Sequence, residues 1–261
     1  MPQPGTVLLM AASALCLGGC LNPDSLSYKS EYDQPRLLAV TGPVAVDVAS
    51  FNGDVSIVVD PRVPYGSVRV RRRATHGYGR GSEAEEALEH IQYTIDVVHG
   101  ESGPLLKVKT WTDDVEPYVL RADLRIRLPE LSGVTVQTQH GSVEAIGFDG
   151  PVQIETTDGG VRELTDRPVV QPVTVTNLRG DIDYRVGGGS SGKFDCQAVD
   201  GDVDQRVRLG RLIILPGTDS DTLLATLNDG QNPVRLRTSE GNIRIAVVPN
   251  ASDAGPLIVS P

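Results

Sequence analysis

The stretch VDGDVDQRV, residues 199–207, places aspartates at three alternate positions, beginning with Asp200. Carboxylates at this spacing open the calcium-binding loop of EF-hands, where their oxygens ligate the ion. That loop needs a glycine at its sixth position and a bidentate glutamate at its twelfth, whereas this chain has Gln205 and Arg211 there. No flanking helices are predicted, so the stretch is not expected to form an EF-hand loop.

The same acids could instead hold a cation between neighbouring repeats of the chain. Asp181 and Asp202 each follow a turn glycine in consecutive repeats, with Asp183 and Asp204 two residues further on. Stacked at the usual strand spacing of about 4.8 Å, the carboxylates would repel unless a divalent cation lay between them. The alternative is that they are exposed acids, screened by water and salt. We predict no metal site and no cofactor, with these four aspartates as the candidate ligands if calcium binds.

A second stretch that could do chemistry is GGGSSGKF, residues 187–194. It begins like a phosphate loop, but Phe194 stands where Ser or Thr would hold Mg²⁺, and no helix pattern follows. Ser190 satisfies the G-x-S-x-G pattern, which needs a strand-to-helix turn and a partnered histidine. None of the four histidines lies in a recognisable triad context. The stretch is interpreted as a flexible loop, and no catalytic residues are predicted.

The composition indicates a β-rich protein that does not bind nucleic acid. The 261 residues include 28 Gly and 18 Pro, and aromatic residues make up only 4%, which is typical of many turns around a core of small β-branched side chains. The net charge of −10 argues against binding to a phosphate backbone, which needs a basic face. The one basic run, residues 71–73, is interpreted as a solvated strand face rather than an anion site.

The N-terminus carries a targeting signal. Residues 6–19, TVLLMAASALCLGG, form an apolar run of signal-peptide length that is too short to span a bilayer. The sequence continues to LGGC, with Cys20 after two glycines, and resembles the lipobox of bacterial lipoproteins. That resemblance implies cleavage before Cys20 and attachment of acyl chains, palmitate included, to the cysteine. The initial MPQPG departs from the pattern because it lacks Lys and Arg, and an ordinary secretory peptide or a buried strand is the alternative.

This resemblance divides the chain into three parts. Residues 1–19 are the predicted lipoprotein signal peptide, residues 20–39 a polar lipid-anchored tether, and residues 40–261 the folded domain. No later apolar stretch reaches membrane-spanning length, so we expect the protein to sit on a membrane of the cell envelope. If Cys20 carries lipid, Cys196 has no disulfide partner and is expected to be a small buried core residue.

Short alternating strands are predicted to position these residues. The run LLAVTGPVAVDVASFNGDVSIVVD gives two apolar-alternating strands around Asn52-Gly53, a pair typical of hairpin turns. The only helix is predicted over residues 82–91, where Ser82 and Glu85 form a capping box before an apolar face.

The later chain repeats a unit of about 20 residues, each a strand, a glycine turn and a second strand, as in VTVTNLRGDIDYRV. Successive turn glycines are 18, 21, 21 and 40 residues apart, so one more copy is expected within residues 211–227, where its turn has decayed. The glycines are Gly141, Gly159, Gly180, Gly201 and Gly241. Because one unit cannot bury its own apolar face, the pattern favours an all-β solenoid of stacked rungs with one short helix inserted. A β-sandwich is the alternative.

The repeated unit T-x-x-G-[SDN]-[VI]-x-[VAI], here TQHGSVEA and TSEGNIRI, resembles a bacterial family of adhesin-like β-strand repeats of unknown function, related to the "head GIN" domains of auto-transporter adhesins. The order of an early repeat, a helix-containing excursion, an RIRLP strand and a run of repeats is similar over about residues 40–250. The resemblance implies a right-handed β-helix on the envelope, with no established activity and no catalytic residues to carry over. The chain departs from the family at residues 187–192 and near residue 217.

These patterns predict a lipid-anchored envelope protein, on the outer membrane and facing the periplasm or the cell surface. It would bind, adhere or scaffold through a polar sheet face, without catalysis. The expected partners are the membrane, reached through the lipid, and a polysaccharide or an envelope protein. One alternative is a polysaccharide lyase or hydrolase that uses the four aspartates, by analogy with parallel β-helix enzymes. The other is a structural module stabilised by calcium.

Overall fold

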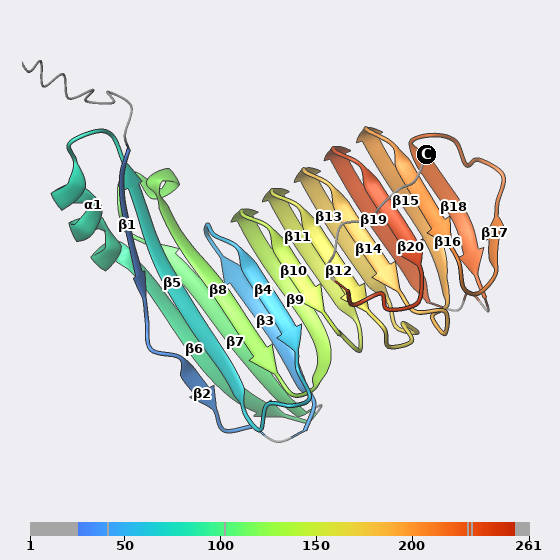
Figure 1. Cartoon of the computed structure of the whole chain (residues 1–261), viewed down its shortest axis with the longest axis horizontal. Helices are drawn as coiled ribbons and strands as arrows, with labels where there is room; N and C mark the ends of the chain where they lie inside the picture. The colour runs from blue at the N-terminus through green and yellow to red at the C-terminus, as the bar shows by residue number, and fades with distance from the viewer. Residues whose placement is uncertain (1–25, 41, 102, 229, 231, 254–261) are drawn as a thin grey trace, which may run out of the picture.

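The computed structural model describes residues 26–40, 42–101, 103–228, 230 and 232–253. In these residues the chain forms two ten-stranded sheets that face each other across one hydrophobic core (Figure 1). One short α-helix lies at the end of the molecule that holds the first strands. The architecture confirms the predicted all-β, solenoid-like fold with one helix inserted.

The two sheets, called A and B here, are each continuous along the whole molecule. Sheet B runs in the order β17 (Leu212–Ile214), β18 (Thr222–Leu227), β15 (Gly192–Asp200), β19 (Pro233–Glu240), β13 (Val173–Arg179), β11 (Val152–Asp158), β9 (Leu131–His140), β3 (Val44–Ser50), β7 (Gly103–Thr112) and β6 (Ile91–Gly100). Sheet A runs in the order β1 (Ser27–Tyr32), β5 (Gly66–His76), β8 (Leu120–Leu128), β4 (Val55–Val59), β10 (Val143–Ile146), β12 (Val161–Thr165), β14 (Ile182–Val186), β20 (Ile243–Val247) and β16 (Val203–Val207), with β2 (Arg36–Leu38) also paired to β5.

Each rung of the solenoid crosses from sheet B to sheet A at a glycine turn. β9 leads into β10, β11 into β12, β13 into β14, β15 into β16 and β19 into β20, at the five predicted glycines. Neighbouring rungs pair in parallel, for example Val152 with both Val134 and Val173. The earlier pair β3 and β4 follows the same rule. Asn52-Gly53 is therefore not a hairpin turn as predicted, because β3 and β4 belong to different sheets.

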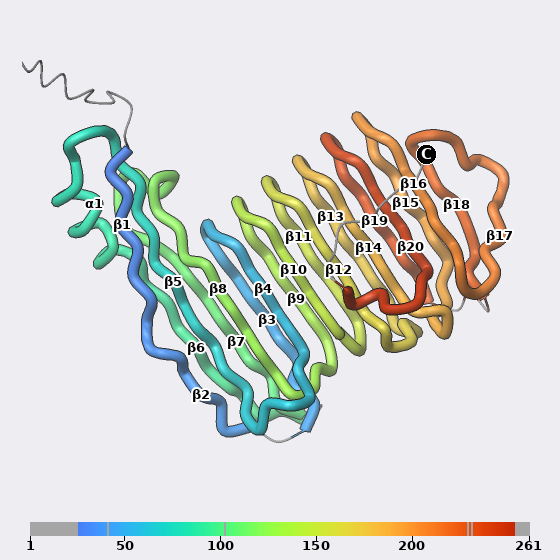
Figure 2. The backbone as a smooth tube through the Cα atoms, in the orientation of Figure 1, coloured from blue at the N-terminus to red at the C-terminus, as the bar shows by residue number. Residues whose placement is uncertain are grey.

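The rungs are not stacked in chain order. The last rung, β19–β20, lies between β13–β14 and β15–β16, as the tube in Figure 2 shows. The copy expected within residues 211–227 is not a rung, because β17 and β18 pair antiparallel and extend sheet B beyond β15. The prediction that Asp181 stacks directly on Asp202 is likewise wrong. These residues precede β14 and β16, and β20 lies between those two strands.

The core follows from the period of two along each strand. Ile182, Tyr184 and Val186 of β14 point inward and are buried, as are their counterparts in β20. Cys196 of β15 is a free, buried core residue, as expected. Burial raises the pKa of its thiol to about 12, so the reactive thiolate is scarce at neutral pH.

The predicted helix is confirmed, although its start differs. α1 (Gly81–Ala87) is followed by a 3₁₀ turn, η1 (Leu88–His90), and a second 3₁₀ turn, η2 (Pro117–Val119), precedes β8. Ser82 lies inside α1, and no side chain caps the helix, so the predicted capping box does not form. Ala84, Ala87 and Leu88 pack into the core and hold the helix against the sheets.

Part of the predicted tether is structured. Within residues 20–39, β1 pairs antiparallel with β5 over six positions, and β2 also pairs antiparallel with β5, further along that strand. The predicted signal peptide and Cys20 lie outside the described residues. Among the residues that the structure does describe, no helix has the length and apolar character needed to cross a membrane.

Candidate ligand-binding groove

The polar residues that follow the turn glycines have a clear structural role. The carboxylate Oδ1 of Asp181 accepts a hydrogen bond from the backbone N–H of Asn242 at 2.9 Å. The Oδ1 of Asn242 in turn accepts one from the N–H of Asp202, also at 2.9 Å. Asp54 does the same for Ser142 at the other end of the stack. These side chains satisfy backbone donors at the turns, which explains why short polar residues recur there.

The four candidate metal ligands do not converge. Asp181 forms an ion pair with Arg244 at 3.1 Å, and Asp183 receives two hydrogen bonds from Arg185. Arg244 also lies between Asp183 and Asp204 in the strand register. Across residues 26–253, apart from the few positions left undescribed, no group of three or more His, Cys, Asp or Glu side chains could hold a metal ion. Asn242 and Arg244 therefore lie between the two pairs of aspartates.

The glycine-rich stretch is a packed connection rather than a phosphate loop. Ser190 is buried, and its hydroxyl oxygen accepts a hydrogen bond from the N–H of Val169 at 3.0 Å. The stretch leads into strand β15 at Gly192, so no helix N-terminus faces it. Ser190 is thus neither exposed nor on a strand-to-helix turn, the two features that a nucleophile elbow requires.

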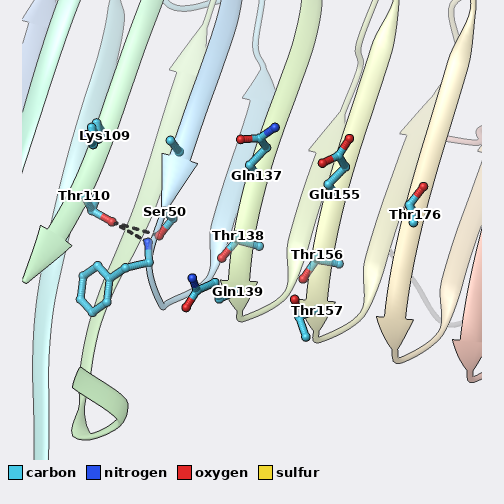
Figure 3. A pocket seen from close by; sticks show the side chains of 12 residues that line it. Ser50, Lys109, Thr110, Gln137, Thr138, Gln139, Glu155, Thr156, Thr157 and Thr176 are labelled. Atoms are coloured by element: carbon cyan, nitrogen blue, oxygen red, sulfur yellow. Dashed lines mark hydrogen bonds between the residues drawn. The ribbon is translucent and has the colours of Figure 1, made fainter. Parts of the chain in front are cut away.

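A shallow groove of about 540 Å³ lies across β7, β3, β9, β11 and β13, close to their glycine turns. Its upper row consists of outward side chains that are neighbours in the strand register: Lys109, Ala49, Gln137, Glu155 and Thr176. Figure 3 shows the long side chains of this row side by side on consecutive strands. Ala49 lies between Lys109 and Gln137, and its short side chain makes the groove deeper at this strand.

The groove is also lined by small hydroxyl residues one strand position closer to the turns, which point inward and are buried. The hydroxyls of Ser50 and Thr110 are 3.1 Å apart and share a hydrogen bond, drawn in Figure 3. Thr138 and Thr156 continue this set on β9 and β11. The hydroxyl of Thr156 is buried and has no hydrogen-bond partner in the described part of the chain.

The groove offers hydrogen bonds rather than acid–base chemistry. Amide, hydroxyl and ammonium groups line it, and Glu155 is its only carboxyl side chain. Glycoside hydrolysis in most families uses a pair of carboxyl groups, which these lining residues do not supply. The sequence-based predictions missed this groove. Its residues lie up to 127 positions apart in the chain, and only the rung register brings them together.

Comparison with one solved structure agrees with the fold. Among curated proteins, no relative of the chain was found. A candidate cell adhesion protein from Clostridium sporogenes has a similar structure, with a TM-score of 0.54 and 11% identity, over 84% of this chain and 100% of that one. A candidate adhesin from Bacteroides fragilis aligns over 82% of this chain and 97% of its own, with 11% identity and a TM-score of 0.33.

The sequence itself also matches a family. The profile of the Toastrack DUF4097 domains matches residues 87–246, which run from the end of α1 to β20 and include every rung after the first. The relation to "head GIN" domains, predicted from the repeats, stays a prediction. The match covers more than half of the chain, which belongs to the Toastrack DUF4097 family.

Proposed function

We propose that the protein is a lipid-anchored lipoprotein of the cell envelope that binds a hydroxyl-rich ligand, such as a polysaccharide, through the groove on sheet B, without catalysis. The observation that carries the proposal is the row Gln137, Glu155 and Thr176 on three adjacent strands. Amides, carboxylates and hydroxyls at about 4.8 Å intervals can bind successive hydroxyl groups along an extended chain.

Two further observations support binding as an adhesion module. The row stands on a rigid parallel sheet, so its groups are held in place before a ligand arrives. The Clostridium sporogenes protein with the similar fold is described as a candidate cell adhesion protein. The low identity of 11% means that this likeness supports the fold, and the groove itself carries the ligand proposal.

Alanine at Gln137 and Glu155 together should weaken polysaccharide binding at least about tenfold, because hydrogen bonds to a charged group contribute about 1.5–3 kcal/mol each. The measurement is binding of the purified protein to a panel of immobilised neutral and uronate-containing polysaccharides. Gln197→Ala is the matched control, since Gln197 is an exposed glutamine on the outer face of β15, outside the groove. Equal losses in both variants, or no binding to any polysaccharide of the panel, would contradict the groove proposal.

The anchoring proposal has its own test. Cys20→Ser should abolish incorporation of radiolabelled palmitate, because in lipoprotein processing the thiol receives the diacylglyceryl group before cleavage and acylation of the new amine. It should also shift the protein out of the membrane fraction. Cys196→Ser is the control, because Cys196 is buried and should leave both results unchanged. Palmitate incorporation that survives Cys20→Ser would refute lipidation at this position.

A further inference from the structure

Strands β1, β5 and β8 form one end of sheet A (Figure 1), and a cluster of arginines lies on the outer face of β5 and β8. We call it the arginine face, and it consists of Arg69 and Arg71 of β5 and Arg121, Arg125 and Arg127 of β8. All of them except Arg71 are exposed. The whole chain carries a net charge of −10, so this face is opposite in sign to the rest of the protein.

Two of these arginines stand directly opposite each other. Arg69 pairs with Arg125 in the antiparallel register of β5 and β8, and neither guanidinium has a hydrogen bond or ion pair within the described residues. Like charges at directly opposed positions destabilise a sheet. Along the rest of sheet A the charges alternate across successive strands, in the order Glu144, Arg162, Asp183, Arg244 and Asp204. Directly opposed arginines occur on β5 and β8 alone among these strands, as Arg69 with Arg125 and as Arg73 with Arg121.

Arg71 is held in place without an acidic partner. Its guanidinium donates to the hydroxyls of Ser30 and Tyr28 at 2.8 and 2.7 Å, and it lies 5.0 Å from the centre of the Tyr32 ring. The nearby carboxylates belong to Asp123 and Asp54, and both form ion pairs with Arg73. Arg69, Arg71 and Arg125 line a pocket of about 200 Å³ together with Asp54 and Asp123. With Arg73, the arginines outnumber the two acids, so the net charge there is positive.

The geometry points to an anionic membrane surface as the occupant of this face, with lipid phosphates bound by Arg69, Arg71 and Arg125. Guanidinium groups bind phosphate oxygens through paired N–H donors. Tyr28, Tyr32 and Leu37 are exposed beside the arginines, and aromatic side chains with a polar end favour the membrane interface. This pattern revises the interpretation of residues 71–73 as only a solvated face.

The strand β1 beside the arginine face begins close to Cys20 in the sequence, which favours a membrane over a soluble polyanion as the ligand. Only six residues lie between Cys20 and Ser27, where β1 begins. Fully extended, this segment spans at most about 25 Å. A lipid on Cys20 would keep β1, and with it the arginine face, close to the headgroups. This step rests on the proposed lipid anchor, whereas the charge and the pocket do not.

The test uses the full chain carrying Cys20→Ser, so that no acyl group contributes, and vesicles with or without phosphatidylglycerol. Phosphatidylcholine vesicles report any binding by the apolar N-terminus, which is the same in all variants. We expect phosphatidylglycerol to increase binding and added salt to reverse the increase. Arg69→Gln with Arg125→Gln should weaken the phosphatidylglycerol-dependent binding about thirtyfold, since each arginine near an anionic surface contributes about fivefold.

The control removes the same charge elsewhere. Arg211→Gln with Arg235→Gln deletes two exposed arginines outside the arginine face and should leave binding within about twofold of the parent. Equal binding to both kinds of vesicle, or equal losses in the two double variants, would overturn the inference. So would binding of soluble polygalacturonate through Arg69 and Arg125 in the absence of any vesicle binding. Because the parent lacks Cys20, none of these results depends on lipidation.

Discussion

Replacing Glu163 by glutamine is expected to stabilise the protein by about 3 kcal/mol at pH 7. Glu163 lies on β12 between Ala145 and Tyr184 of the neighbouring strands and is fully buried. Neither of its carboxyl oxygens has a hydrogen-bond partner in the described residues. At pH 7 burial keeps this group protonated although the unfolded chain would ionise it, which costs stability, whereas the neutral amide of glutamine has nearly the same shape and needs no protonation.

The effect should depend on pH in a defined direction. Burial raises the pKa of Glu163 from its ordinary 4.5 to about 8. The folded chain therefore keeps the proton between these values while the unfolded chain loses it. The wild-type free energy of unfolding should fall as pH rises from about 4.5 to 8 and level off above, by about 5 kcal/mol in total. The Glu163→Gln variant lacks this fall.

Urea unfolding followed by circular dichroism between pH 4.5 and 9 measures both quantities. Glu130→Gln is the control, because Glu130 is exposed and its substitution should leave the pH profile of the wild type intact. Superimposable pH profiles for wild type and Glu163→Gln would show that the carboxyl group is solvated or paired in solution.

Alanine at Gly159 should destabilise the protein by at least about 4 kcal/mol or prevent folding. Gly159 has a φ of +130°. A Cβ added there would lie 2.3 Å from the carbonyl oxygen of Gly141 on the rung below, and Gly180 meets Gly159 in the same way. The turn glycines thus form a column in which each backbone occupies the space that a side chain of the next would need. No side-chain rearrangement can relieve a clash with backbone.

Gly79→Ala separates this clash from the cost of the backbone angle alone. Gly79 also has a positive φ, +78°, but nothing lies within 4 Å of a Cβ built there. Its replacement should cost only about 1–2 kcal/mol, the usual penalty for a left-handed residue. Thermal melts of the two variants are the measurement. Melting temperatures lowered equally in both would mean that the rungs separate enough to admit a methyl group.

The repeats allowed much of the fold to be predicted, because turn glycines and a period of two depend on local geometry. The five turns and the inward set Ile182, Tyr184 and Val186 were confirmed for this reason. The same alignment places Glu163 at the position of Tyr184, so its burial could have been recognised from sequence. The order of the rungs could not, because any rung offers its neighbours a similar parallel edge.

The groove and the arginine face escaped prediction for a related reason. Gln137 and Glu155, or Arg69 and Arg125, become neighbours only through strand register, which the sequence pattern leaves undefined between distant segments. The aspartates of residues 199–207 were noticed because they are close in the chain. Their actual partners, Asn242 and Arg244, follow about 40 residues later.

The insertion of β19–β20 has a consequence for the order of assembly. During synthesis β15–β16 emerges before the rung that separates it from β13–β14, so the edge of β14 is available to β16 before β20 exists. Stacked on each other, the two would bring Asp181 against Asp202 and Asp183 against Asp204, an arrangement that charge repulsion opposes. Arrival of β20 replaces both repulsive contacts with Asn242 and Arg244. We therefore expect direct stacking of β16 on β14 to be less favourable than insertion of β20 between them.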